Sequence, residues 1–322
     1  MAGRGAGVAQ AVVAVLLAGA VAAVLGLRPT GGEEPVTLTC VGDIMLGRDV
    51  AVACEEHGPA WPLAEVAGEL ARADLTFGNL ECPLTNAATR LPRVNSLRAS
   101  PDMARVLADA GFDVLGLANN HAADYGRPGL TETLSALEEA GITPVGAGRT
   151  LADAKAGRVI TVRGMRVGFA GFSNFPYVNF THDPARPGIA MLSEEALREC
   201  LPPLARRCDV LMVSFHWGKE GAREVSDFER RTAHLAVDLG ADLVVGHHAH
   251  VRGEIERYRG AIICYCLGNL AFDDSSWGGN EGWILRCRVS RSGVKSFEAL
   301  PVEVADCRAR HAVPDGWASH RQ

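Results

Sequence analysis

The sequence has no cluster of positive charge. Its 32 Lys and Arg residues are spread along the chain without a basic block, and 38 Asp and Glu residues bring the formal net charge to −6. Nucleic-acid-binding proteins usually carry a basic patch, because contacts with the phosphate backbone dominate their affinity. The charge pattern therefore gives no reason to expect a nucleic-acid partner.

Paired cysteines are also missing. The chain has nine Cys residues, but none forms a CxxC pair or a zinc-ribbon spacing. Cysteines within apolar, strand-like runs are expected to be small buried hydrophobic residues; these are Cys40, Cys264, Cys266 and Cys287. A disulfide between Cys200 and Cys208 remains an open alternative outside the cell.

Aromatic residues make up only 6% of the chain, and no internal repeat is found. In contrast, 48% of the 322 residues are hydrophobic. Such a chain can bury a large core and corresponds to one sizeable domain or two small ones.

The N-terminal segment Val8–Leu27 is apolar, with Gln10 as its one clearly polar side chain. Its twenty residues are long enough to cross a bilayer, which predicts a single-pass membrane anchor with the folded body outside the cytoplasm. A cleaved signal peptide is the first alternative, because the segment is Ala-rich and follows Arg4, and a non-membrane helix is the second. We expect an anchor and linker over 1–35, a folded domain over 36–305 and a surface tail over 306–322.

Short apolar runs alternate with amphipathic stretches after the linker, which predicts an α/β fold. The expected strands are Thr37–Val41, Leu75–Phe77, Val114–Leu117, Val167–Ala170, Val210–Ser214 and Leu243–Val245. The expected helices are Pro62–Ala71, Pro101–Ala110, Gly129–Ala140, Ser193–Arg206 and Ser226–Leu239, with Ser100, Ser193 and Ser226 as N-caps.

Two hairpin turns, at Arg163-Gly164 and Arg259-Gly260, interrupt this alternation, so the sheets are expected to be mixed. Two further strands, Trp283–Val289 and Ser296–Val302, follow the last predicted helix. We expect them to contribute to a second sheet.

Polar residues follow several of the predicted strands. They are Asp43, Asn79 and Glu81, Asn119-Asn120-His121, His216, and the run His247-His248-Ala249-His250. Ligands of α/β proteins bind at the carboxyl ends of the strands, so these side chains are expected to converge. Each residue alone has an ordinary structural explanation, but five such strand ends together predict a metal centre.

The ligand types narrow the choice of ion. Carboxylates from Asp43 and Glu81, an Asn carbonyl and three imidazoles suit Mn, Fe or Zn better than Ca. One or two ions are expected, and a pair would activate water and stabilise charge on the atom under attack. His121, beside the Asn ligand, is then a candidate general acid for the leaving group.

Six separated motifs resemble, in order and spacing, the poly-gamma-glutamate capsule biosynthesis family of the CapA type. They are Gly42-Asp43-Ile44-Met45-Leu46-Gly47-Arg48, Asn79-Leu80-Glu81, Leu117-Ala118-Asn119-Asn120-His121 with Asp124-Tyr125-Gly126, His216-Trp217-Gly218, Gly246-His247-His248-Ala249-His250 and Leu267-Gly268-Asn269. The resemblance covers about Val36 to Asp273. It implies a calcineurin-like metallophosphoesterase fold, a four-layer α/β/β/α sandwich.

The resemblance also implies roles for individual residues. The implied metal ligands are Asp43, Glu81 in a bridging place, Asn120, His216, His248 and His250. Asn79 and Asn269 are implied to orient ligands through hydrogen bonds, and His121 to lie near the leaving group. Arg98 resembles a family arginine that grips a substrate carboxylate or phosphate, and a surface arginine is the alternative.

Met45 departs from the wider superfamily, in which Asp-x-His follows the first strand. A thioether is a poor ligand for these ions, so one metal position lacks an imidazole. The site then holds either two ions, one of them weakly, or a single ion.

The resemblance implies a membrane-anchored, metal-dependent hydrolase or transferase that acts on a poly-gamma-glutamate-like polymer or another cell-envelope substrate, with a capsule synthesis complex as a possible partner. A general phosphomonoesterase or phosphodiesterase, with a phosphoester substrate, is the first alternative. The second is a non-catalytic scaffold of a capsule synthesis or export complex.

Overall fold

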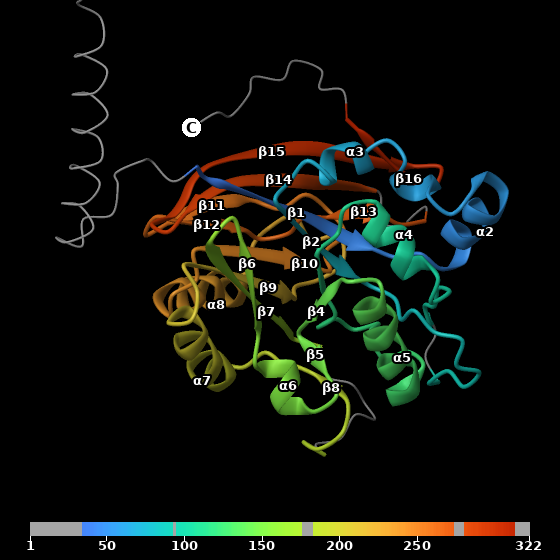
Figure 1. Ribbon diagram of the computed structural model, residues 1–322, viewed down its shortest axis with the longest axis horizontal. Coiled ribbons are helices and arrows are strands. Elements are labelled where there is room, and N and C mark those ends of the chain that lie inside the picture. The colour runs from blue at the N-terminus through green and yellow to red at the C-terminus, as the bar shows by residue number, and fades with distance from the viewer. Residues whose placement is uncertain (1–33, 93–94, 176–182, 274–279, 313–322) are drawn as a thin grey trace, which may run out of the picture. The chain divides into compact units, whose positions relative to one another are not determined.

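The computed structural model describes residues 34–92, 95–175, 183–273 and 280–312 (Figure 1). The chain divides into Met1–Glu34 and Pro35–Gln322. The predicted membrane segment Val8–Leu27 lies outside the described residues, as does 313–322. None of the helices within the described ranges has the length and hydrophobicity needed to cross a bilayer.

The first sheet has eight strands and contains both parallel and antiparallel pairs. Its order is β16-β15-β14-β1-β2-β3-β4, and β13 pairs with β1. Strands β1 to β4 and β13 run parallel, whereas β14 to β16 are antiparallel to their neighbours. The strands are β1 (Val36–Ile44), β2 (Leu75–Leu80), β3 (Val114–Gly116), β4 (Thr143–Val145), β13 (Asn269–Ala271), β14 (Glu281–Ser290), β15 (Gly293–Ala305) and β16 (Arg308–His311).

The second sheet has six strands in the order β11-β12-β10-β9-β7-β6. These are β6 (Arg158–Val162), β7 (Met165–Ser173), β9 (Val210–His216), β10 (Leu243–His247), β11 (Ile255–Tyr258) and β12 (Ala261–Cys264). Both predicted hairpins are confirmed: Arg163-Gly164 joins β6 to β7, and Arg259-Gly260 joins β11 to β12. All four turn residues have positive φ, as a two-residue type I′ turn requires. A small separate pair joins β5 (Ala147–Gly148) to β8 (Gly188–Ile189).

The predicted helices are present at the expected positions. Two further helices were not predicted, and one predicted helix is divided into two elements. The helices are α2 (Arg48–His57), a 3₁₀ turn (Trp61–Leu63), α3 (Ala67–Leu70), α4 (Met103–Asp109), α5 (Gly126–Glu139), α6 (Leu151–Lys155), α7 (Glu194–Ala205) and α8 (Asp227–Asp238). Helices α2 and α6 were not predicted, and the single helix expected over Pro62–Ala71 is instead the 3₁₀ turn followed by α3. Ser193 and Ser226 are N-caps as predicted, but α4 starts after Asp102, so the expected cap at Ser100 was wrong.

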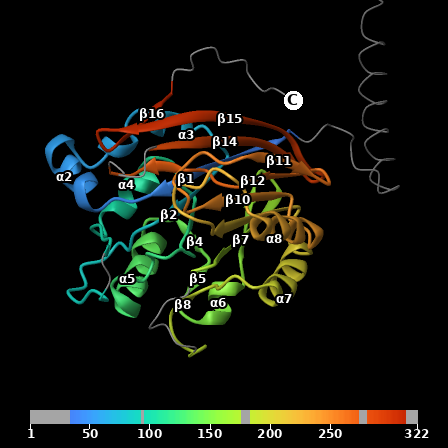
Figure 2. The ribbon, with the colours of Figure 1, turned by 180° about the vertical axis from the view of Figure 1, so that it is seen from behind.

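Three hydrophobic clusters show how the layers stack. Between the sheets, Phe77 of the first packs on Phe169 of the second, with ring centroids 6.4 Å apart. Leu107 of α4 and Leu134 of α5 belong to the cluster on the outer face of the first sheet, and Leu201 of α7 to the cluster on the outer face of the second. Figures 1 and 2 show these two helix groups on opposite sides of the sheets. The order is therefore helix, sheet, sheet, helix.

The C-terminal strands were assigned to the wrong sheet. β14 pairs with β1 and extends the first sheet together with β15 and β16. Arg308–His311, which falls in the segment expected to be a tail, forms β16. The nine cysteines are all free, so the alternative of a Cys200–Cys208 disulfide is not realised, and the four cysteines expected to be buried are buried.

Replacing Ser226 by alanine is expected to lower the free energy of unfolding by about 1 kcal/mol, because this residue forms a complete capping box at the start of α8. Its Oγ accepts from the Glu229 backbone N–H, while the Glu229 carboxylate accepts from the Ser226 backbone N–H. Urea unfolding measures the difference. Ser100→Ala is the matched control and is expected to change stability less, because that hydroxyl caps no helix. Equal effects of the two changes would contradict this role for the box.

Candidate metal centre

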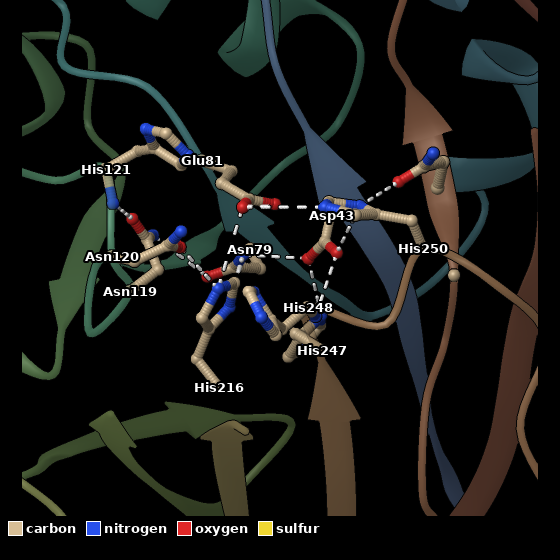
Figure 3. A network of polar contacts seen from close by, with 12 residues as sticks. Asp43, Asn79, Glu81, Asn119, Asn120, His121, His216, His247, His248 and His250 are labelled. Atoms are coloured by element: carbon tan, nitrogen blue, oxygen red, sulfur yellow. Dashed lines mark hydrogen bonds and ion pairs between the residues drawn. The ribbon is translucent and has the colours of Figure 1, made fainter. Parts of the chain in front are cut away.

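Neighbouring strands carry polar residues to one place. In the first sheet, Asp43 on β1 pairs in register with Asn79 on β2 and with Asn269 on β13. In the second sheet, His216 and His247 end β9 and β10 and are also register partners. Figure 3 shows the side chains from both sheets pointing toward one another. The predicted convergence at strand ends is therefore present in the fold.

Asp43 is fully buried and contacted from several sides. Its Oδ1 accepts a 2.8 Å hydrogen bond from Asn79 Nδ2, and its Oδ2 accepts one of 3.1 Å from the His248 backbone N–H. His247 Nδ1 lies 3.1 Å from Oδ1, and His250 Nδ1 lies 3.4 Å from Oδ2. Burial alone would raise the pKa of this carboxyl, but the contacts with His247 and His250 hold it well below its usual range. Asp43 is therefore ionised.

Glu81, directly after β2, has no hydrogen-bond partner for either carboxylate oxygen, although both are buried. One oxygen lies 3.6 Å from His216 Nε2 and 3.9 Å from His250 Nε2. Burial, and then the neighbouring Asp43 charge, raise the pKa of Glu81 well above its usual range. Buried carboxylates are normally satisfied, so the structure leaves both oxygens available for a cation.

Among the residues that the structure describes, three groups of side chains have ligand atoms within 4.8 Å of one another and could hold a metal ion. They are Asp43, Glu81 and His250; Glu81, His216 and His248; and Glu220, His248 and His250. Glu81 belongs to the first two groups, which is the property of a bridging ligand. The donor set of carboxylates and imidazoles fits Mn, Fe or Zn.

The histidines differ in protonation. Burial, and then the neighbouring His248 ring, lower the pKa of His216 well below its usual range, while burial and His250 lower the pKa of His248 to about 3. Both imidazoles are thus neutral and offer a lone pair to an ion. Although burial opposes it, Glu81 and Asp43 raise the pKa of His250 to about 10. A bound cation would take the place of the extra proton on His250.

Amide side chains fix the imidazoles. His250 Nδ1 donates to Asn269 Oδ1 at 2.8 Å, which leaves Nε2 on the side of Glu81. Asn79 Nδ2 lies 3.3 Å from His216 Nδ1, and Asn120 Oδ1 lies 2.8 Å from His216 Nε2. The structure thus places Asn79 and Asn269 beside the predicted ligands, where the resemblance implies an orienting role, and Asn120 against His216.

The loop after β10 is conformationally strained. His248 and His250 have φ values of 92° and 58°, in a region that residues other than glycine rarely adopt. Such strain persists only where the surroundings determine the backbone conformation, and it is concentrated at functional sites. Here it turns both imidazoles toward the carboxylates (Figure 3).

His121 lies beside the three groups without belonging to any of them. Its Nδ1 lies 2.8 Å from Asp124 Oδ2, and its backbone N–H donates to Asn119 Oδ1. Asp124 is fully buried and also accepts from the Leu97 backbone N–H. The carboxylate therefore orients the ring and holds the Nδ1 proton, leaving Nε2 for proton exchange.

Arg98 lies outside the groups. It donates a 3.3 Å hydrogen bond to the Ala87 carbonyl, and its guanidinium is 5.0 Å from the centre of the Tyr125 ring. Its backbone packs against Gly47, where an added Cβ would lie 2.4 Å from the Arg98 oxygen. The arginine is thus held close to the loop that follows β1, and its substrate-binding role stays a prediction.

One candidate ligand, Glu220, was missed by the motif analysis, although its position four residues after His216, in the loop that follows β9, was a usable signal. His247, which is not among the implied ligands, is fully buried and contacts Asp43. Met45 offers no replacement ligand, because it is buried in the hydrophobic cluster and its Sδ accepts from the Gly47 backbone N–H at 3.1 Å.

Two stacked mixed sheets with helices outside them, and carboxylate and imidazole side chains at the strand ends, define an α/β sandwich protein with a candidate metal centre. The 5′-nucleotidase precursor from Thermus thermophilus shares this fold, with a TM-score of 0.51 and 15% identity over 88% of this chain and 56% of that chain. The chain belongs to the family described as bacterial capsule synthesis protein PGA_cap, whose model matches residues 37–274. The resemblance noted in the sequence is thereby confirmed.

Several curated relatives are similar over most of the chain. The PGA biosynthesis protein CapA of Bacillus subtilis is 31% identical over 280 residues, which cover 85% of this chain and 73% of that protein. The capsule biosynthesis protein CapA of Bacillus anthracis is 30% identical, with 85% and 69% covered. A probable polyglutamine synthesis accessory protein of Mycobacterium tuberculosis is 29% identical, with 88% of each chain covered.

Proposed function

We propose that this protein is a metal-dependent hydrolase or transferase that acts in the synthesis of a poly-gamma-glutamate-type capsule polymer. The names of the Bacillus relatives support the pathway. The observation that carries the metal chemistry is Glu81, whose two buried oxygens have no hydrogen-bond partner in the middle of three imidazoles. Mn, Fe or Zn is the proposed ion, because the donors are carboxylate, amide and imidazole.

Divalent ions bound here would activate water at neutral pH and polarise the carbonyl or phosphoryl group under attack. The residues of the chain supply the rest. Asp43 and Glu81 provide negative charge, His216 and His248 provide neutral nitrogen ligands, and Asn79 and Asn269 hold the rings in place. His121, whose ring Asp124 orients, is the proposed donor of a proton from Nε2 to a leaving group. Arg98 is the proposed contact for a substrate carboxylate.

The body is proposed to act outside the cytoplasm, anchored by Val8–Leu27. The length and apolar composition of that segment support this placement. Membrane fractionation of the full chain and of a variant lacking 1–35 tests it. Recovery of both proteins in the soluble fraction would argue against an anchor.

Replacing His121 by alanine is expected to reduce turnover about 10²- to 10⁴-fold, the usual contribution of a positioned general acid. Metal content should be unchanged, because His121 belongs to none of the ligand groups. The assay follows the chain length of poly-gamma-glutamate, and separately the release of an aryl alcohol from an aryl phosphate, with Mn²⁺ or Zn²⁺ present.

His57→Ala is the control for this experiment, because His57 is exposed on α2. Turnover of the aryl phosphate alone would favour the general phosphoesterase function. Cleavage of neither substrate with any divalent ion would argue against an enzyme and in favour of a scaffold. Full activity of His121→Ala would exclude the proposed acid.

A further inference from the structure

The loop that follows His216 carries an acidic side chain to the open side of the histidine cluster. Gly218 and Gly221 have positive φ values of 86° and 74°, and the Ala222 backbone N–H donates to the Lys219 carbonyl, so the loop forms a tight turn. The Gly221 backbone N–H also donates to the carbonyl of Ala249 at 2.9 Å. This bond fixes the residue before Gly221, which is Glu220, beside the segment between His248 and His250.

The Glu220 carboxylate lies within 4.8 Å of ring nitrogens of both His248 and His250, and no hydrogen bond or ion pair joins these described side chains. The separation is thus wider than a direct contact. Each metal–ligand bond is about 2.0–2.2 Å long, so two ligand atoms on the same ion can lie up to roughly twice that distance apart. One ion can therefore bridge the gap between Glu220 and the histidines if the partly exposed glutamate moves slightly.

A second observation points independently to a ligand at this place. His248 is 5% exposed, and its Nδ1 is buried without a hydrogen-bond partner. Buried polar nitrogens are rarely left in this state unless a group absent from the polypeptide satisfies them. His248 belongs to two of the groups whose ligand atoms lie within 4.8 Å of one another. One group contains Glu81 and His216, and the other contains Glu220 and His250.

Met45, directly after β1, supplies no ligand, because it is packed in the hydrophobic cluster rather than in the site. We propose that Glu220 is a metal ligand of this protein, which joins His248 and His250 from the loop after β9. This inference rests on the proposed metal centre and extends it by one residue.

A third carboxylate changes the charge of the centre. Asp43 and Glu81 alone would leave a two-ion centre with two positive charges, whereas Asp43, Glu81 and Glu220 together leave one. A four-coordinate ion that takes Glu220 as one of its ligands has one fewer coordination position left for water or substrate. Glu220 therefore also tunes how strongly an anionic substrate is held.

The test is the titration of the ion-free full-length protein with Zn²⁺ and Mn²⁺ by calorimetry, and with Co²⁺ by absorption spectroscopy, which reports the ligand set. Glu220→Gln is expected to bind at least about tenfold more weakly at one class of site and to change the Co²⁺ spectrum. Glu220→Asp keeps the charge but shortens the reach, so it should also bind more weakly. Glu224→Gln removes a charge from an exposed position in the same segment and should match the wild type.

The outcomes separate this inference from the proposed function. If the wild type binds ions and Glu220→Gln matches it in affinity and Co²⁺ spectrum, Glu220 is not a ligand, while the metal centre stands. If Glu220→Asp behaves as the wild type, Glu220 acts through charge at a distance and the inference is overturned. If the wild type binds no ion, both proposals fall. Circular dichroism of the ion-free variants verifies that each has folded.

Discussion

The Glu81→Gln variant is expected to lose its bound metal, and with it the thermal stabilisation that ions give the wild type. Glu81 belongs to two of the three ligand groups, so the substitution removes a negative charge from both positions at once. Free ion at 100 times its dissociation constant would stabilise the wild type by about 2.7 kcal/mol, which is roughly 5–10 °C for a domain of this size. Calorimetric unfolding with and without a chelator measures the shift, and elemental analysis gives the metal content.

The control is Glu139→Gln, which makes the same chemical change at an exposed position on α5. This variant should respond to chelation as the wild type does. Without ions, Glu81→Gln should be at least as stable as the wild type, since burial already raises the pKa of Glu81 and disfavours its charged form. A wild type whose unfolding temperature is unaffected by chelation would argue against a metal centre.

Replacing Gly246 by alanine is expected to destabilise the protein by about 3 kcal/mol or more and to disturb the histidine loop that follows it. A Cβ at this position would lie 1.9 Å from the Tyr265 carbonyl oxygen and 2.6 Å from Trp217 Nε1. These two atoms form a 3.1 Å hydrogen bond, which the methyl group would force apart. Overpacking of backbone against backbone has no flexible side chain to relieve it.

Gly68→Ala is the matched control, because an added Cβ meets nothing within 4 Å at this exposed position of α3. It is expected to be neutral or to stabilise by up to about 1 kcal/mol, the preference of a helix for alanine over glycine. Urea unfolding compares the two variants, and Zn²⁺ titration reports the damage to the loop. Equal stability of the two would mean that β10 and the Tyr265 segment can move apart freely.

The strands and the polar ends of those strands could be predicted from the sequence, because both depend on local patterns. Continuous apolar runs mark buried strands, and parallel strands bring their carboxyl ends to one edge. This rule is enough to bring Asp43 on β1 and Glu81 after β2 together from the sequence. It fails for Glu220, whose position depends on the hydrogen bond from Gly221 to Ala249 in a distant loop.

The pairing of the C-terminal strands could not be predicted for a related reason. β14 pairs with β1, although the two strands lie near opposite ends of the chain: Val36 pairs with Val289 and Val41 with Ile284. Hydrophobic alternation fixes which face of such a strand is buried, but not which strand it joins. Helix α2 was missed because Val50 is its only buried residue, so its apolar pattern is weak.

The two sheets share the candidate ligands, and this has a consequence for how the protein is made. Asp43 and Glu81 leave the ribosome early, whereas His248 and His250 come late in the chain. No partial chain can complete a binding position that needs both sheets, so an ion at such a position would be bound only after the second sheet has docked on the first. The choice of ion would then depend on the compartment in which folding ends.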